Sequence, residues 1–194
     1  MRRLAASMLA CAVLVLATGC GSTPPSRFYT LGSAGAPVTT SSELSVAVGP
    51  VSVPAIVDRP QIVVTTGPNQ VRLDEFNRWA SPLQDNISRV VAENLVAMLG
   101  TPRVTRFLQS ADADAAFRVA IEVQRFDSTP GEAATLDAVW TVRRTKDGRS
   151  ETGRTAVREP EQDKGFEALA AAHSRALARM SRDIADAIRA LAGS

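Results

Sequence analysis

Eight side chains near the C-terminus recur at helical spacing, and this pattern constrains the fold more than any other feature of the sequence. The steps between them are 3, 4, 4, 3, 4, 4 and 3 residues. Such a stripe is typical of one amphipathic helix that buries one side, and it predicts a helix of about 27 residues. The members are Phe166, Leu169, His173, Leu177, Met180, Ile184, Ile188 and Leu191.

A second helix is predicted between Ser81 and Gly100. Apolar residues again recur three and four positions apart, Ser81 is a favourable N-cap, and Pro82 suits the first helical position. Gly100 ends the pattern, as glycine commonly does after a helix. The apolar positions are Leu83, Ile87, Val90, Val91, Leu95 and Met98.

The segments between the helices favour strands. Residues 117–123 and 136–142 alternate apolar and polar side chains, which predicts a hairpin with one solvated face and with Trp140 in the core. Further strands are predicted at 28–31, 44–53 with a kink at Gly49-Pro50, 62–66 paired with 70–73, 103–107 and 152–158. The sequence therefore predicts an α/β domain, with α+β as the alternative, in which two long helices pack on a mixed sheet.

Residues 1–19 are typical of an export signal. Arg2 and Arg3 precede an apolar run, 4–17, that is long enough for a signal-peptide core and too short to span a bilayer. Ala17-Thr18-Gly19-Cys20 then resembles a bacterial lipobox, with Ala17 where leucine is usual. In such a signal the cysteine thiol receives a diacylglycerol, so Cys20 is the predicted lipidation site.

This interpretation divides the chain into a signal peptide (1–19), a lipidated tether (20–27) and a periplasmic auxiliary domain (28–194). Gly21 follows the cysteine in place of the aspartate that retains lipoproteins at the inner membrane in enteric-type sorting. The predicted location is therefore the periplasmic face of the outer membrane. Two or more acyl chains would hold the protein firmly to its leaflet.

Composition and motifs argue against several function classes. The chain has 22 basic and 20 acidic residues, and removal of Arg2 and Arg3 leaves 20 against 20, so the positive charge of a nucleic-acid-binding protein is missing. Cys11 and Cys20 leave the domain without a thiol pair. His173 is the single histidine, and neither G-x-S-x-G nor H-E-x-x-H occurs. We therefore predict no enzyme activity, catalytic residue, metal site or cofactor.

Ordered segments along nearly the whole mature chain carry a resemblance to a known family. They are Cys20 with its tether, 27–31 (Arg-Phe-Tyr-Thr-Leu), 48–54 (Val-Gly-Pro-Val-Ser-Val-Pro), 57–63, 78–83 (Arg-Trp-Ala-Ser-Pro-Leu), 92–95, 124–127 and 136–140. The set resembles the PqiC/YmbA family of ABC-type transport auxiliary lipoproteins. The resemblance implies a single three-layer α/β/α-like domain with a mixed sheet.

The resemblance also implies a function. The chain would serve an MCE-type lipid transport system that carries phospholipid between two membranes, would dock a periplasmic MCE-domain protein, and would support membrane integrity. Because MCE assemblies are rings, a homo-oligomeric ring is a further expectation. The alternative is a structural envelope lipoprotein that binds peptidoglycan or another envelope protein.

Four residues are candidates for contact with that partner. Asp58 and Arg59 precede a predicted strand, and Arg78 and Trp79 precede the first predicted helix, where an exposed Arg-Trp pair would suit an interface. Structural roles are the alternatives: an ion pair and a turn at Asp58 and Arg59, and packing of Trp79 onto the sheet. His173 is interpreted as a core or interface histidine because it lies on the apolar stripe.

Overall fold

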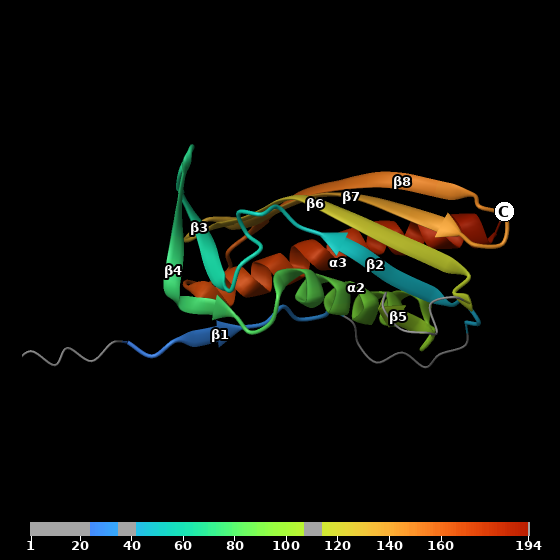
Figure 1. Ribbon diagram of the computed structural model, residues 1–194, viewed down its shortest axis with the longest axis horizontal. Helices are drawn as coiled ribbons and strands as arrows, with labels where there is room; N and C mark the ends of the chain where they lie inside the picture. The colour runs from blue at the N-terminus through green and yellow to red at the C-terminus, as the bar shows by residue number, and fades with distance from the viewer. Residues whose placement is uncertain (1–23, 35–41, 107–113, 194) are drawn as a thin grey trace, which may run out of the picture.

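The computed structural model describes residues 24–34, 42–106 and 114–193 of the 194-residue chain. The predicted signal peptide and Cys20, with the predicted tether up to residue 23, lie outside these ranges. Within them, a mixed sheet of eight strands carries two helices (Figure 1). The elements are β1 (Arg27–Tyr29), β2 (Val46–Ser52), β3 (Gln61–Gly67), β4 (Gln70–Trp79), α2 (Leu83–Leu99), β5 (Val104–Arg106), β6 (Phe117–Thr129), β7 (Ala133–Arg144), β8 (Ser150–Pro160) and α3 (Phe166–Ala192).

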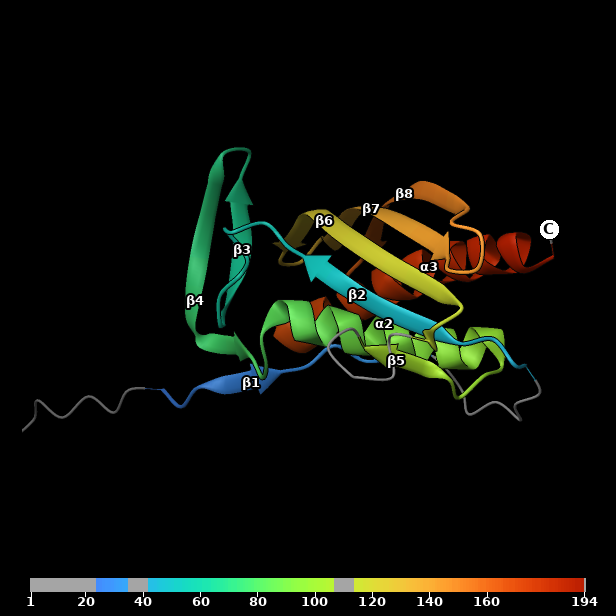
Figure 2. The same ribbon diagram turned by 45° about the vertical axis from the view of Figure 1, so that its right-hand side comes forward.

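The strands divide into a large sheet and a small blade. In the large sheet, β6 runs antiparallel to β7 and parallel to β2, and β8 and β5 form its edges among the described strands. The small blade is formed by β1, β4 and β3, and it stands away from the large sheet (Figure 2). Strand β3 of the blade pairs with β6 of the large sheet at one position among the described residues, Val64 with Ser128. Side-chain packing must therefore hold the blade in place.

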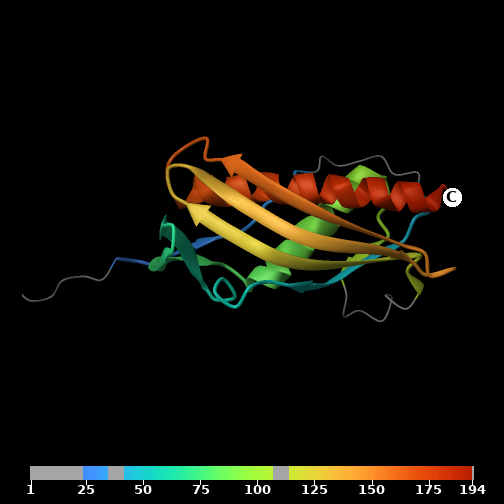
Figure 3. The same cartoon turned by 90° about the horizontal axis from the view of Figure 1, so that it is seen from above.

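Both helices pack on the same face of the large sheet and against each other. Helix α3 contacts β6, β7 and β8, whereas α2 contacts β2 and β5 (Figure 3). The opposite face of β6 stays exposed, because Arg118, Glu122 and Gln124 alternate with buried apolar residues. The predicted α/β class, mixed sheet, two long helices and solvated sheet face are confirmed. The described residues form two layers in place of the three that the resemblance implied, because charged side chains occupy the outer face.

The predicted elements differ from the observed ones mainly at their ends. Helix α3 has the predicted 27 residues, and Gly100 ends α2 in a left-handed conformation with φ 63°. Pro82, not Ser81, occupies the N-cap position of α2, and no side chain caps that helix. The kink in β2 is confirmed, because its register with β6 shifts between Val48 and Val51.

Strand β4 extends well beyond the predicted 70–73, because it bends at Asp74 and then pairs with β1. The Asp74 carboxylate accepts hydrogen bonds from the backbone N–H groups of Phe76 and Asn77, at 3.2 and 2.9 Å, and from the Asn77 side chain. Burial opposes ionisation of Asp74, but hydrogen bonds from Asn77 and Arg72 outweigh it and lower its pKa. The alternation of apolar and polar residues could not predict this bend, because the bend depends on hydrogen bonds to a side chain.

The core lies between the two helices and the large sheet. Met180, Ile184 and Ile188 are fully buried, and so is His173. The His173 ring stacks on Phe126 at 3.8 Å between ring centroids, and its Nε2 lies 2.8 Å from the Ser128 hydroxyl. The interpretation of His173 as a core residue is confirmed.

Trp140 also lies in the core, as predicted, with 6% of its surface exposed. Its Nε1–H donates to the Thr155 hydroxyl at 3.1 Å, and that hydroxyl donates to Asp183 of α3 at 2.5 Å. The Trp140 ring lies across Gly153 of the neighbouring strand, its partner in the register. The missing side chain at Gly153 thus makes room for the indole.

The segment after β1 runs between the two helices and ties them together. The Leu31 carbonyl accepts a hydrogen bond from Arg89 of α2 at 2.6 Å, and the Gly32 N–H donates to Ser174 of α3 at 2.9 Å. The Ala34 N–H then donates to Asn94 of α2 at 2.9 Å. We call residues 30–34 the strap. The backbone of the strap forms hydrogen bonds with side chains of both helices, where a strand would pair with a neighbouring strand.

Substitution Gly153→Ala should destabilise the fold. A Cβ at this position would lie 2.8 Å from Trp140 Cε2 and closer still to two other ring atoms, so the indole must move. We expect the free energy of unfolding in urea to fall by about 1–3 kcal/mol. Gly32→Ala is the matched control, because nothing lies within 4 Å of a Cβ there. Equal stability of the two variants would contradict the packing described for Trp140.

His173 should make the fold sensitive to mild acid. Burial lowers the pKa of His173 from 6.5 to about 3. Below pH 6.5 the unfolded chain therefore binds a proton that the folded chain does not, so stability falls as the pH falls toward 3. Between about pH 6 and pH 5 the loss should be about 1 kcal/mol, measured by urea denaturation. His173→Gln should lack this loss; an unchanged pH slope in that variant would show that other groups cause it.

Candidate functional site

Three of the four predicted contact residues line one pocket at the base of the small blade. The pocket has a volume of about 430 Å³ and is lined by Asp58, Arg59, Pro60, Trp79, Ala80, Ser81 and Pro82. The fold brings the two segments together because the Trp79 N–H donates to the Pro60 carbonyl at 2.7 Å, next to the pairing of β3 with β4. We call this the Arg59 pocket.

Arg59 lines the pocket and carries a buried polar atom without a partner among the described residues. Its side chain is half-buried, and its buried Nε has no hydrogen-bond partner among the described residues. A buried donor without an acceptor costs about 1–3 kcal/mol, so a carboxylate or carbonyl oxygen from a ligand would stabilise it. The predicted turn is present, with the Asp58 N–H donating to the Pro54 carbonyl at 3.1 Å. Asp58 is exposed and accepts a hydrogen bond from Gln84 of α2 at 3.1 Å.

Arg78 and Trp79 lie on opposite faces of β4 and do not form one exposed pair. Trp79 is 6% exposed and packs edge-to-face against Phe126 and His173, at centroid distances of 6.2 and 6.3 Å. This is the packing onto the sheet that was the structural alternative, although Trp79 also forms a wall of the Arg59 pocket. Arg78 points to the outer side and its Nε donates to the Glu75 carbonyl at 2.9 Å.

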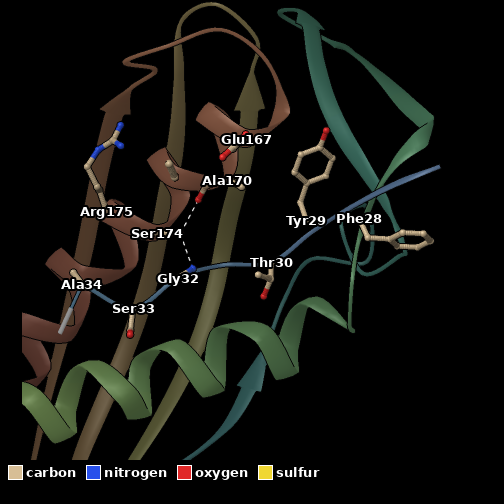
Figure 4. A pocket seen from close by; sticks show the side chains of 11 residues that line it. Phe28, Tyr29, Thr30, Gly32, Ser33, Ala34, Glu167, Ala170, Ser174 and Arg175 are labelled. Carbon is tan, nitrogen blue, oxygen red and sulfur yellow. Dashed lines mark hydrogen bonds between the residues drawn. The ribbon is translucent and has the colours of Figure 1, made fainter. Parts of the chain in front are cut away.

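A second pocket, of about 600 Å³, lies between β1, the strap and the start of α3 (Figure 4). Its apolar lining comes from Phe28, Tyr29, Ala170 and Ala171. Arg175 lines it too, but its guanidinium donates to the Pro160 carbonyl at 2.6 Å and pairs with Glu159 at 3.4 Å. Sequence analysis missed this pocket, because small residues on one helix and a strap distant in sequence give no common motif.

Ser128 and His173 place a hydroxyl beside an imidazole, the pairing that nucleophilic catalysis uses. The histidine is fully buried, its Nδ1 has no partner among the described residues, and burial keeps it neutral near pH 7. A Ser-His-Asp triad needs a carboxylate that orients the histidine through Nδ1, and it needs access for a substrate. This buried pair has neither. No cluster of three His, Cys, Asp or Glu side chains in the described ranges could hold a metal ion.

Helix α3 is long but carries arginines along its exposed side. Within residues 24–34, 42–106 and 114–193, neither helix combines the length and the apolar character needed to cross a bilayer. Membrane attachment through Cys20 falls outside the described residues and stays a prediction.

Comparison with solved structures agrees with the fold. A crystal structure titled as an uncharacterized protein aligns with a TM-score of 0.70 and 21% identity, covering 85% of this chain and 99% of that one. Protein XCC0632 from Xanthomonas campestris, of the family DUF330, aligns with a TM-score of 0.65 and 22% identity, covering 82% and 93%. A search of curated proteins finds no match.

The family comparison covers most of the chain. The model of the ABC-type transport auxiliary lipoprotein component matches residues 29–185, which include β2 to β8, helix α2 and most of α3. This family is a transport component rather than an enzyme family, and its lipoprotein character indicates the cell envelope. The resemblance drawn from the sequence is thereby confirmed, and the chain belongs to the ABC-type transport auxiliary lipoprotein family.

Proposed function

We propose that this chain is the outer-membrane-anchored, periplasmic lipoprotein subunit of an MCE-type phospholipid transport system, and that it docks the periplasmic MCE-domain protein. The observation that carries the docking role is the Arg59 pocket, which holds a buried donor without a partner among the described residues. Family membership supplies the link to ABC-type transport. A ring of several copies, matching a ring-shaped MCE assembly, belongs to the same proposal.

The Arg59 pocket has the features of a protein-binding site. Trp79 provides a rigid aromatic wall, because Phe126 and His173 hold its ring from the core side. Pro60 and Pro82 add apolar surface that loses little conformational freedom on binding. An acidic side chain or a main-chain carbonyl of the partner would accept from Arg59 and remove the cost of its unpaired donor. Asp58 at the rim would select against a second acidic group.

The anchor determines where this docking takes place. Lipidation at Cys20 would hold the protein at the periplasmic leaflet of the outer membrane, and Gly21 favours that membrane over the inner one. The domain would then work by holding two envelope components together, which would support membrane integrity. The buried Ser128–His173 pair, remote from solvent, fits a role without catalysis.

Cys20→Ala should remove the protein from the outer membrane without unfolding the domain. In cell fractionation, we expect the variant in the soluble periplasmic fraction or retained as uncleaved precursor, and no acyl groups by mass spectrometry. Cys11→Ala is the matched control, because Cys11 belongs to the predicted signal peptide and should leave the mature protein unchanged. Wild-type behaviour of Cys20→Ala in the outer-membrane fraction would refute the anchor.

Arg59→Gln should weaken docking. The lipidated protein, purified from membranes in mild detergent, is expected to bring an MCE-domain protein with it. Loss of a central arginine should reduce that recovery about tenfold. Arg103→Gln, which removes an exposed arginine paired with Glu43 near β5, is the control and should have no effect. Recovery of peptidoglycan fragments alone would favour the structural alternative, and equal recovery with both variants would place the docking surface elsewhere.

A further inference from the structure

The exposed large apolar side chains of the described residues gather at one end of the molecule. They are Phe28 (64% exposed), Ile56 (49%), Val71 (46%) and Phe76 (38%). Phe28 lies on β1, Val71 and Phe76 lie on β4, and Ile56 lies in the turn before β3. All four therefore belong to the small blade or adjoin it. We call them the apolar rim. The large sheet and both helices contribute no member.

One arginine, Arg78, accompanies the aromatic members of the rim. Phe28 and Arg78 are register partners in the parallel pair of β1 with β4, so their side chains point to the same side of the blade. Phe76 lies two residues before Arg78 on β4, whereas Arg27, one residue before Phe28, points to the other side of β1. Phe28 and Tyr29 both line the second pocket, but their rings point in different directions (Figure 4), and Phe28 is the more exposed of the two. Exposed aromatic rings beside arginines are a composition found where proteins meet the headgroup region of a bilayer.

The length of the tether determines what the rim can reach. Eight residue steps separate Cys20 from Phe28, so the tether spans at most about 28 Å when fully extended. Helix α3 is longer, about 40 Å for its 27 residues, and it starts beside Tyr29, where Phe166 lies 6.0 Å from the Tyr29 ring. The far end of α3 lies at the opposite end of the molecule (Figure 1). An anchored chain therefore keeps its β1 end close to the leaflet.

We propose that the apolar rim rests on the phospholipid leaflet that holds the anchor. Phe28 and Phe76 enter the boundary between headgroups and acyl chains, and Arg78, the register partner of Phe28, faces the lipid phosphates. This rests on the lipidation of Cys20 in the proposed function and adds a second, protein-made contact. It orients α3 away from the membrane, with the turn between β7 and β8 on the side far from the leaflet.

The test uses the lipidated full chain in vesicles of phosphatidylethanolamine and phosphatidylglycerol. Acylation blocks Cys20, so a cysteine introduced at one site is the single free thiol of the mature chain and takes a nitroxide label. The sites are Val71→Cys and Phe76→Cys on the rim, with Lys146→Cys in the turn between β7 and β8 as the control. Electron paramagnetic resonance then compares access of the label to a water-soluble nickel chelate and to oxygen, which concentrates in the bilayer.

We expect the labels at 71 and 76 to lose access to the nickel chelate and gain oxygen collisions, whereas the label at 146 stays accessible to the chelate. Adding Phe28→Ser to the Val71→Cys protein should restore chelate access, and Phe28 is exposed enough for this change to leave the fold intact. Equal chelate access at 71, 76 and 146 in protein that floats with the vesicles would overturn the proposal. Protein that fails to float would overturn the anchor itself, and with it this orientation.

Discussion

Three aromatic rings hold the small blade to the rest of the domain. His173 of α3 stacks on Phe126 of β6, and Trp79 at the end of β4 packs edge-to-face against both. The backbone register joins blade and large sheet through one pair of residues alone, Val64 with Ser128. The position of the blade, the shape of the Arg59 pocket and the direction of the apolar rim therefore all depend on this cluster of rings. Because His173 is fully buried in this cluster and burial lowers its pKa, the cluster is also the expected source of acid sensitivity in the fold.

The sequence predicts those elements of the fold whose pattern lies within one continuous segment, and it fails where contacts between distant segments decide the structure. The α3 stripe repeats over a long segment, so its helix, its length and its buried side follow from spacing alone. The bend in β4 depends on Asp74 accepting hydrogen bonds from residues just beyond it, and no alternation pattern encodes such a contact. Which face of the sheet each helix covers is decided by packing between distant segments, so the number of layers came from the structure.

In the candidate site, too, some features could be predicted from the sequence and others could not. Asp58 and Arg59 could be singled out because they directly precede a predicted strand, and Trp79 because it directly precedes a predicted helix. That they share a pocket follows from the pairing of β3 with β4, which the predicted hairpin foreshadowed. That Arg78 and Trp79 face opposite ways follows from strand geometry once β4 is known to reach them. The strap could not be foreseen, since its hydrogen-bond partners lie on α2 and α3, far away in sequence.

The strap also bears on how the domain would respond to tension on its anchor. A pull on the tether acts along β1, whose hydrogen bonds to β4 lie across the direction of pull. The bonds would then share the load in shear instead of opening one after another. Behind them, Arg89 and Ser174 fasten Leu31 and Gly32 to both helices. Under the proposed anchoring and docking, a force exerted by the transport assembly on the domain would load the tether and β1 before it unfolded the core.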